Sequence, residues 1–241
     1  PDAFSQHAVL VLPGTSQETW VSLAVRRSPF GKLPTALQGG TALILEPAGG
    51  ARAAPVPLEP PEESASSCMA DLILSGALIP DLALRAQVDL LGRSVEEYGG
   101  KERIRTIQDE LKKQSLGAAA SMLFPGSRLL EGAFPGLDDP KEPLRIHLSL
   151  EAPKALSPRG DGEVLLKPVL QSAELLKRFI RRPRREHPYR LGLQMVIRDR
   201  ITISTGPGLR FTKVPEGLSR ISKIGSYRLS FTPAAPDPQG G

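Results

Sequence analysis

The sequence predicts a mainly β (α+β) fold, built from short strands with one helical insertion. Short apolar runs alternate with turn residues along most of the chain, which has 24 prolines and 23 glycines among 241 residues. Several of these runs alternate apolar and polar residues, as in an antiparallel strand with one buried face. Only residues 94–117 have the spacing of a helix.

The first part of the chain, residues 1–47, is predicted to contain strands. Residues 7–13 and 19–25 are apolar runs joined by a short loop, which predicts a hairpin. A third strand is expected in residues 41–47. Residues 48–67 contain mainly Ala, Pro, Gly, Glu and Ser, so we interpret them as a linker and as the domain boundary.

Residues 68–233 are expected to form an antiparallel β-sandwich or curled sheet. Every second residue is apolar in the three segments 82–92, 143–153 and 192–204, and Asp199 interrupts the inward row of the last segment. We expect Asp199 at a bend or at the margin of the sheet. Two further strands are predicted, in residues 209–215 and 225–233. Residues 234–241 are rich in Pro and Gly and are predicted to be disordered.

The helical insertion is expected at about residues 101–115. Ser94 and Glu97 have the spacing of a capping box. Gly99 and Gly100 are expected to separate a short turn from the main helix. The apolar face of the helix is predicted from the helical spacing of its members, which are Ile104, Ile107 and Leu111.

The net charge of +5 is concentrated in residues 177–190, which hold seven Lys or Arg and one Glu, so that the other residues sum to −1. Pro183 and Pro188 interrupt any helix there, so we predict a solvated helix end and loop. An anionic partner is the alternative for this stretch, and no nucleic acid is expected. His187 and His147 are expected to lie at the surface.

Cys68 is the single cysteine, which excludes an internal disulfide and a multi-cysteine metal site. Cys68 is predicted to be a small buried hydrophobe. Asp138 and Asp139 are predicted to lie in a surface turn, because no further ligand cluster accompanies them. No cofactor is implied, and no apolar run reaches the roughly 18 residues of a transmembrane helix.

A series of motifs opens the chain: F-x-x-H-A-V-L-V-L-P, then W-V-S-L, then S-P-F-G-K-L-P-T-A-L-Q-G and A-L-I-L. This order resembles the end of the catalytic core in bacterial transglutaminase-like proteins that have a domain of unknown function before the core. The resemblance continues, with less specific motifs, over nearly the whole chain: Leu137 to Asp139 with Pro143 and Leu144, Arg185 to Gly192, Pro207 to Pro215, and Ile224 to Tyr227. It implies that residues 1–47 are the last strands of a papain-like/transglutaminase-like core and that a β-rich domain follows.

The resemblance also implies a Cys–His–Asp triad, of which this chain retains one member. His7 matches the histidine base, whereas Ser22 stands where the aspartate is expected and Leu23 where a proline is expected. The nucleophile is expected upstream of residue 1, and Cys68, which follows the histidine, does not match it. Loss of the carboxylate in a Ser-His-Asp triad lowers turnover by about 10⁴-fold. We therefore expect the chain to be inactive alone.

Two functions are consistent with these features. In the first, the chain is the C-terminal part of a transglutaminase-like protein, and its β-domain supports the core or binds a partner. The expected partners are then the missing N-terminal part and a protein or peptide substrate. In the second, the chain is a non-catalytic β-sandwich module for binding or scaffolding in the cell envelope, a location that the resemblance suggests. His7 favours the first function and Ser22 the second, while residues 177–190 leave a membrane-surface or nucleic-acid contact as a third.

Overall fold

A computed structural model describes residues 9–13, 18–23, 29–76, 82–160, 162–166, 196–222 and 225–232. The chain divides into two units, residues 1–206 and residues 207–241, and each is described by itself. Strands predominate in the described residues and two α-helices accompany them, which confirms the mainly β class. Neither helix is long and apolar enough to cross a membrane.

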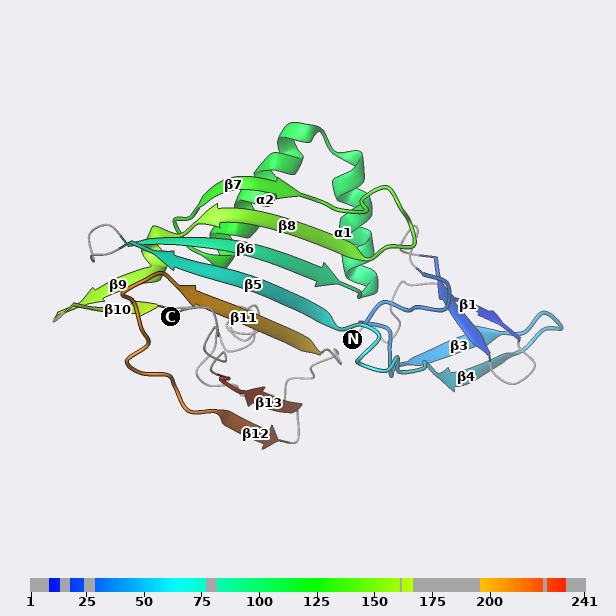
Figure 1. The fold of residues 1–241 in the computed structure, drawn as a ribbon. Coiled ribbons are helices and arrows are strands. Elements are labelled where there is room, and N and C mark those ends of the chain that lie inside the picture. Colours follow the sequence, from blue (N-terminus) through cyan, green and yellow to red (C-terminus); the bar gives the residue numbers. More distant parts are fainter. Residues whose placement is uncertain are drawn as a thin grey trace, which may run out of the picture. The chain divides into compact units, whose positions relative to one another are not determined.

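The largest element of the first unit is a five-stranded sheet with the order β11-β5-β6-β8-β7 (Figure 1). Its strands are β5 (Ser66–Ser75), β6 (Ala83–Gly92), β7 (Arg128–Ala133), β8 (Leu144–Glu151) and β11 (Ile197–Thr205). All neighbours are antiparallel except β5 and β11, which are parallel. The prediction of an all-antiparallel sheet is therefore wrong at this edge. A parallel pair needs a long crossover between its strands, and residues 76–196 supply it.

The buried face of this sheet is the one that the alternation of the sequence predicts. Leu84 and Val88 on β6 and Leu148 and Leu150 on β8 are at most 1% exposed. Among the described strands, β11 forms one edge of the sheet, and Asp199 lies on it. Its expected position at the sheet margin is confirmed.

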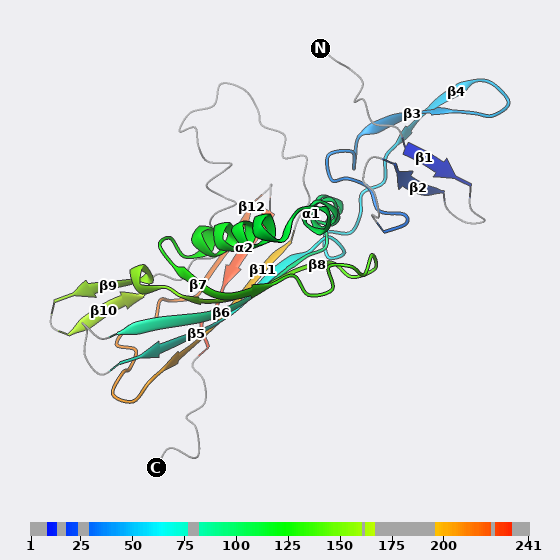
Figure 2. The same ribbon diagram turned by 90° about the horizontal axis from the view of Figure 1, so that it is seen from above.

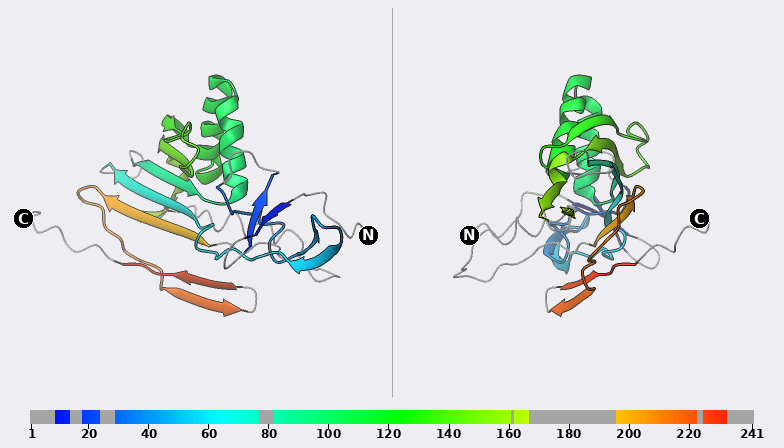
Figure 3. Two further views of the ribbon diagram at one scale, coloured as in Figure 1. Left: turned by 90° about the vertical axis from the view of Figure 1, so that its right-hand side faces the viewer. Right: turned by 60° about the vertical axis from the view of Figure 1, so that its left-hand side comes forward.

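Helix α2 (Asp109–Leu123) covers the buried face, whereas the β-sandwich alternative placed a second sheet there. Its side chains Leu116, Ala120 and Leu123 belong to the same apolar cluster as the inner rows of the strands. Both helices lie over one face of the sheet (Figures 2 and 3). Alternation along a strand shows that one face is buried, but it does not show whether a helix or a sheet covers that face.

Helix α1 (Val95–Thr106) begins at the predicted capping box, in which Ser94 Oγ accepts from the Glu97 amide and Glu97 Oε2 accepts from the Ser94 amide. The expected single helix at 101–115 is wrong. Helix α1 continues through Gly99 and Gly100, and the break falls at Ile107, whose backbone is extended with ψ 161°. Ile107 therefore ends one helix and does not belong to the apolar face of another.

The predicted N-terminal hairpin is confirmed, since β1 (Val9–Leu12) pairs antiparallel with β2 (Thr19–Ser22). A second hairpin joins β3 (Thr41–Leu45) to β4 (Ala51–Pro55). Strand β4 lies inside residues 48–67, so the interpretation of that stretch as a linker is wrong for these residues. Two glycines with positive φ, Gly49 and Gly50, form the turn. The small core of this region contains Trp20, Leu33, Ala54 and Val56.

The remaining strands form two hairpins. In the first unit, β9 (Leu156–Arg159) pairs with β10 (Glu163–Leu166). In the second unit, β12 (Leu218–Ser222) pairs with β13 (Gly225–Leu229). The strand predicted at 209–215 is absent, and β12 begins three residues later. Pro215 has no N–H for a ladder, which disfavours a strand there. Residues 234–241 lie outside the described residues.

Candidate functional site

The position expected to hold a triad aspartate faces inward. Ser22 is 4% exposed at the end of β2, where it lies opposite Val9. Trp20, two residues earlier on the same face of the strand, is also buried. Ser22 is therefore a buried polar side chain at the end of the strand. His7 lies outside the described residues.

The loop that follows this hairpin binds the carboxylate of Glu59. Lys32 Nζ lies 2.5 Å from Glu59 Oε1, and the Gln38 amide donates to Glu59 Oε2 at 3.3 Å. Ser64 Oγ donates to the same Oε2 at 2.7 Å, and the backbone amide of Glu59 donates to Gln38 Oε1 at 3.1 Å. We call Lys32, Gln38, Glu59 and Ser64 the Glu59 cluster.

The Glu59 cluster has the geometry of an anchor. The Lys32 and Glu59 side chains are only 20% and 12% exposed, and both oxygens of the carboxylate accept hydrogen bonds. An ion pair shielded from water in this way is screened less by salt than a surface pair. Lys32 and Gln38 belong to the P-F-G-K-L-P-T-A-L-Q-G motif, so the motif residues tie their loop to residues 59–64. Sequence reasoning missed Glu59, because its partners are separated from it by 27 and 21 residues.

Cys68 lies near the start of β5 with 3% of its surface exposed, which confirms the prediction of a small buried hydrophobe. Burial raises the pKa of the Cys68 thiol to about 12, and the negative charges of Asp199 and Asp89 contribute to the rise. Thiolate is the nucleophilic form of cysteine. At neutral pH Cys68 is therefore an unreactive thiol.

A histidine and an aspartate face each other on the opposite side of the same sheet. His147 on β8 and Asp89 on β6 are cross-strand partners, and His147 Nδ1 lies 2.8 Å from Asp89 Oδ1. Cys68 on β5 faces the core together with Leu90, so the sheet separates its sulfur from this pair. The three residue types of a thiol triad thus lie on neighbouring strands without forming a triad. The predicted surface position of His147 is confirmed in part, since its side chain is 37% exposed.

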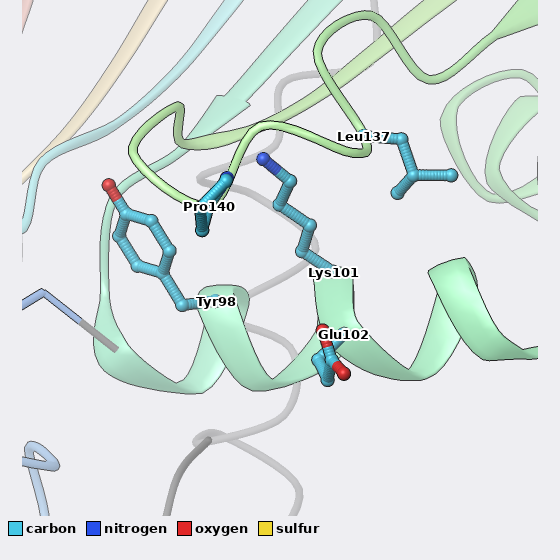
Figure 4. Close-up of a pocket in the computed structure, with 5 residues that line it drawn as sticks. All are labelled: Tyr98, Lys101, Glu102, Leu137 and Pro140. Atoms are coloured by element: carbon cyan, nitrogen blue, oxygen red, sulfur yellow. The ribbon is translucent and has the colours of Figure 1, made fainter. Parts of the chain in front are cut away.

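A small pocket lies between α1 and the loop that contains Leu137 and Pro140. Tyr98 and Lys101 point from α1 toward this loop, whereas Glu102 points away from it (Figure 4). The pocket measures about 10 Å³, which is the space of a single water molecule. It is therefore too small for an organic substrate.

Lys101 is almost fully buried, and its side chain binds backbone carbonyl groups of this loop. Its ammonium group donates to the carbonyl of Asp139 and, at 2.8 Å, to the carbonyl of Glu142. Burial lowers the pKa of Lys101. The predicted turn at Asp138 and Asp139 is confirmed, and Asp139 Oδ1 accepts from the amide of Lys141 at 2.9 Å. Sequence reasoning did not identify Lys101, which looks like any other helix-surface lysine.

No group of three or more metal-ligating side chains occurs in the described part of the chain. The basic stretch 177–190, with His187, lies outside that part. No protein-family model matches the chain, and neither a curated protein nor a solved structure proves similar to it. The likeness to transglutaminase-like proteins therefore depends on the motifs alone.

Proposed function

We propose that this chain is a non-catalytic β-rich module that binds or supports another polypeptide and carries out no thiol chemistry of its own. The state of Cys68 supports this proposal most directly. Its sulfur is buried and its pKa is raised to about 12, whereas a nucleophilic cysteine needs an exposed thiolate.

The resemblance to transglutaminase-like proteins is used in this proposal to interpret residues 1–47. In this interpretation, residues 1–47 are the last strands of such a core, and the Glu59 cluster anchors them to the chain that leads into the large sheet. Ser22 supports loss of catalysis, because a hydroxyl does not carry the charge that stabilises a protonated imidazole. A location in the cell envelope follows from the resemblance and is part of the proposal.

A catalytic parent protein is the second candidate, and His7 is the observation that favours it. In that case His7 would serve as the base for a thiolate supplied from elsewhere in the same protein. The partners would then be the N-terminal part of the core and a protein or peptide substrate.

Thiol labelling and an activity assay test the main proposal. The chain is treated with iodoacetamide at neutral pH, with and without denaturant, and is assayed for amide hydrolysis and amide transfer. We expect labelling of Cys68 only in denaturant, and the same background activity in the wild type, His7→Ala and Cys68→Ala. Rapid labelling of the folded chain, or activity that His7→Ala or Cys68→Ala removes, would contradict the proposal.

A further inference from the structure

The second unit is basic. Its residues 207–241 contain five Lys or Arg and two acidic residues, Glu216 and Asp237, a local balance of +3. The basic residues are Arg210, Lys213, Arg220, Lys223 and Arg228. Among the described residues, neither Arg220 nor Arg228 of the β12–β13 hairpin forms an ion pair, unlike most arginines of the large sheet. This unit therefore presents uncompensated positive charge.

The same hairpin exposes apolar side chains and two strand edges. Ile221 is 86% exposed and Leu218 is 42% exposed. In the part of the chain that the structure describes, β12 pairs only with β13 and β13 only with β12. Each strand consequently keeps one row of backbone N–H and C=O groups that no described strand pairs.

An isolated two-stranded hairpin is at best marginally stable in water. A third strand would pair one open edge and would cover the apolar residues beside it. An acidic strand added beside β12 would also place carboxylates near Arg220, and one added beside β13 would place them near Arg228. We propose that the β12–β13 hairpin binds an extended acidic segment of another polypeptide as an added strand. This inference rests on the proposed binding function and names the chemistry of one partner.

Two other anionic partners match the hairpin less well. A lipid surface could attract the arginines, but lipid offers no partners for the open backbone groups of a strand edge. Nucleic acid would engage the arginines through phosphate and would leave the exposed Ile221 uncovered. An extended acidic peptide would bring negative charge to the arginines, pair the open backbone groups of one strand edge and cover the apolar side chains beside it.

The test uses the full chain and a capped peptide of alternating glutamate and valine, with a lysine–valine peptide for comparison. We expect the acidic peptide to bind and to slow hydrogen exchange of backbone amides in β12 or β13. Its binding should weaken as salt is added. The charge-reversed variant Arg220→Glu/Arg228→Glu should lower the affinity by at least about tenfold, which is about 1.4 kcal/mol. Ile221→Ser should weaken binding less.

A matched variant controls for net charge. Arg103 on α1 and Arg159 on β9 are exposed and form no ion pair among the described residues, so Arg103→Glu/Arg159→Glu changes the charge equally outside the second unit. We expect its affinity to equal that of the wild type. Equal loss in both double variants, equal binding of both peptides, or no binding of the acidic peptide would overturn the proposal. Binding only to vesicles containing phosphatidylglycerol, or only to DNA, would also overturn it. The thiol assay tests the proposed function by a separate readout, so failure of peptide binding and failure of the proposed function can be told apart.

Discussion

Gly92 is the last residue of strand β6 and lies just before helix α1. Because it has no side chain, it leaves room for the capping box. A Cβ atom at this position would lie 2.3 Å from Glu97 Cδ. The Glu97 carboxylate accepts from the Ser94 amide at 2.8 Å and from Ser66 Oγ at 2.9 Å. The carboxylate therefore links the start of the helix to the start of strand β5, and a side chain at 92 would displace it from both partners.

We predict that Gly92→Ala lowers the free energy of unfolding by about 1–2 kcal/mol, the value of a lost cap. Urea denaturation measures this change. Gly117 is the matched control, because it lies inside α2, where an added Cβ atom would have nothing within 4 Å. Gly117→Ala should stabilise the protein by about 0.5–1 kcal/mol. Equal effects of the two substitutions would contradict this account of Gly92.

The thiol of Cys68 should make stability depend on pH in the alkaline range. In the unfolded chain the thiol ionises near its ordinary pKa, whereas in the folded protein its pKa is raised to about 12 by burial. Between these two values the unfolded state binds fewer protons, so stability falls as the pH rises, by about 1.4 kcal/mol per pH unit for this group. Below the ordinary pKa the contribution is fully present.

We predict that the difference in free energy of unfolding between wild type and Cys68→Ala is constant below about pH 8 and shrinks above about pH 9. Urea denaturation of both proteins across this range measures it. The comparison removes the titration of lysines and tyrosines, which the two proteins share. A difference that stays constant up to about pH 11 would show that Cys68 ionises equally in the folded and unfolded chain.

At the scale of elements, the Glu59 cluster connects the loop after the N-terminal hairpin to residues 59–64. Glu59 receives hydrogen bonds from Lys32, Gln38 and Ser64, and it is more shielded than the surface pairs of the helices. We predict that Glu59→Gln lowers the free energy of unfolding by about 1–3 kcal/mol, because Lys32 is left partly buried without a charge partner.

The exposed helix pair of Glu110 and Lys113 provides the control for Glu59→Gln, since both side chains are more than two-thirds exposed. Glu110→Gln should change the free energy of unfolding by less than about 0.5 kcal/mol. Thermal and urea denaturation of the two variants measure the contrast. If Glu59→Gln proves as mild as Glu110→Gln, the cluster is not an anchor.

The helical insertion shows where prediction from sequence succeeds and where it does not. The capping box at Ser94 and Glu97 is a local pattern of side chain and backbone, and it was predicted correctly. The expected apolar face joined Ile104, Ile107 and Leu111 across a break in the helix. The face that packs on the sheet belongs to α2 and includes Leu116 and Ala120. Helical spacing does not show where the backbone becomes extended.

Across the molecule as a whole, the described core is concentrated between the five-stranded sheet and α2. We predict that Leu148→Ala, at a fully buried position of β8, lowers the free energy of unfolding by about 2–5 kcal/mol. Ile221→Ala, at a position 86% exposed on β12, should change it by less than about 0.5 kcal/mol. Urea denaturation of both variants is the measurement, and a larger loss for Ile221→Ala would place core packing in the second unit.

Local patterns in the chain were enough to predict the mainly β class, the inward rows of β6 and β8, the buried state of Cys68 and the capping box at Ser94 and Glu97. These features depend on neighbours in sequence, namely on alternation, composition and capping. The folded molecule was needed to establish that α2 covers the sheet, that β11 runs parallel to β5, that β4 extends into the expected linker, and that Lys32 and Gln38 meet Glu59. Each of these depends on contacts between segments far apart in the chain, and no local pattern specifies which distant partner a side chain or strand will meet.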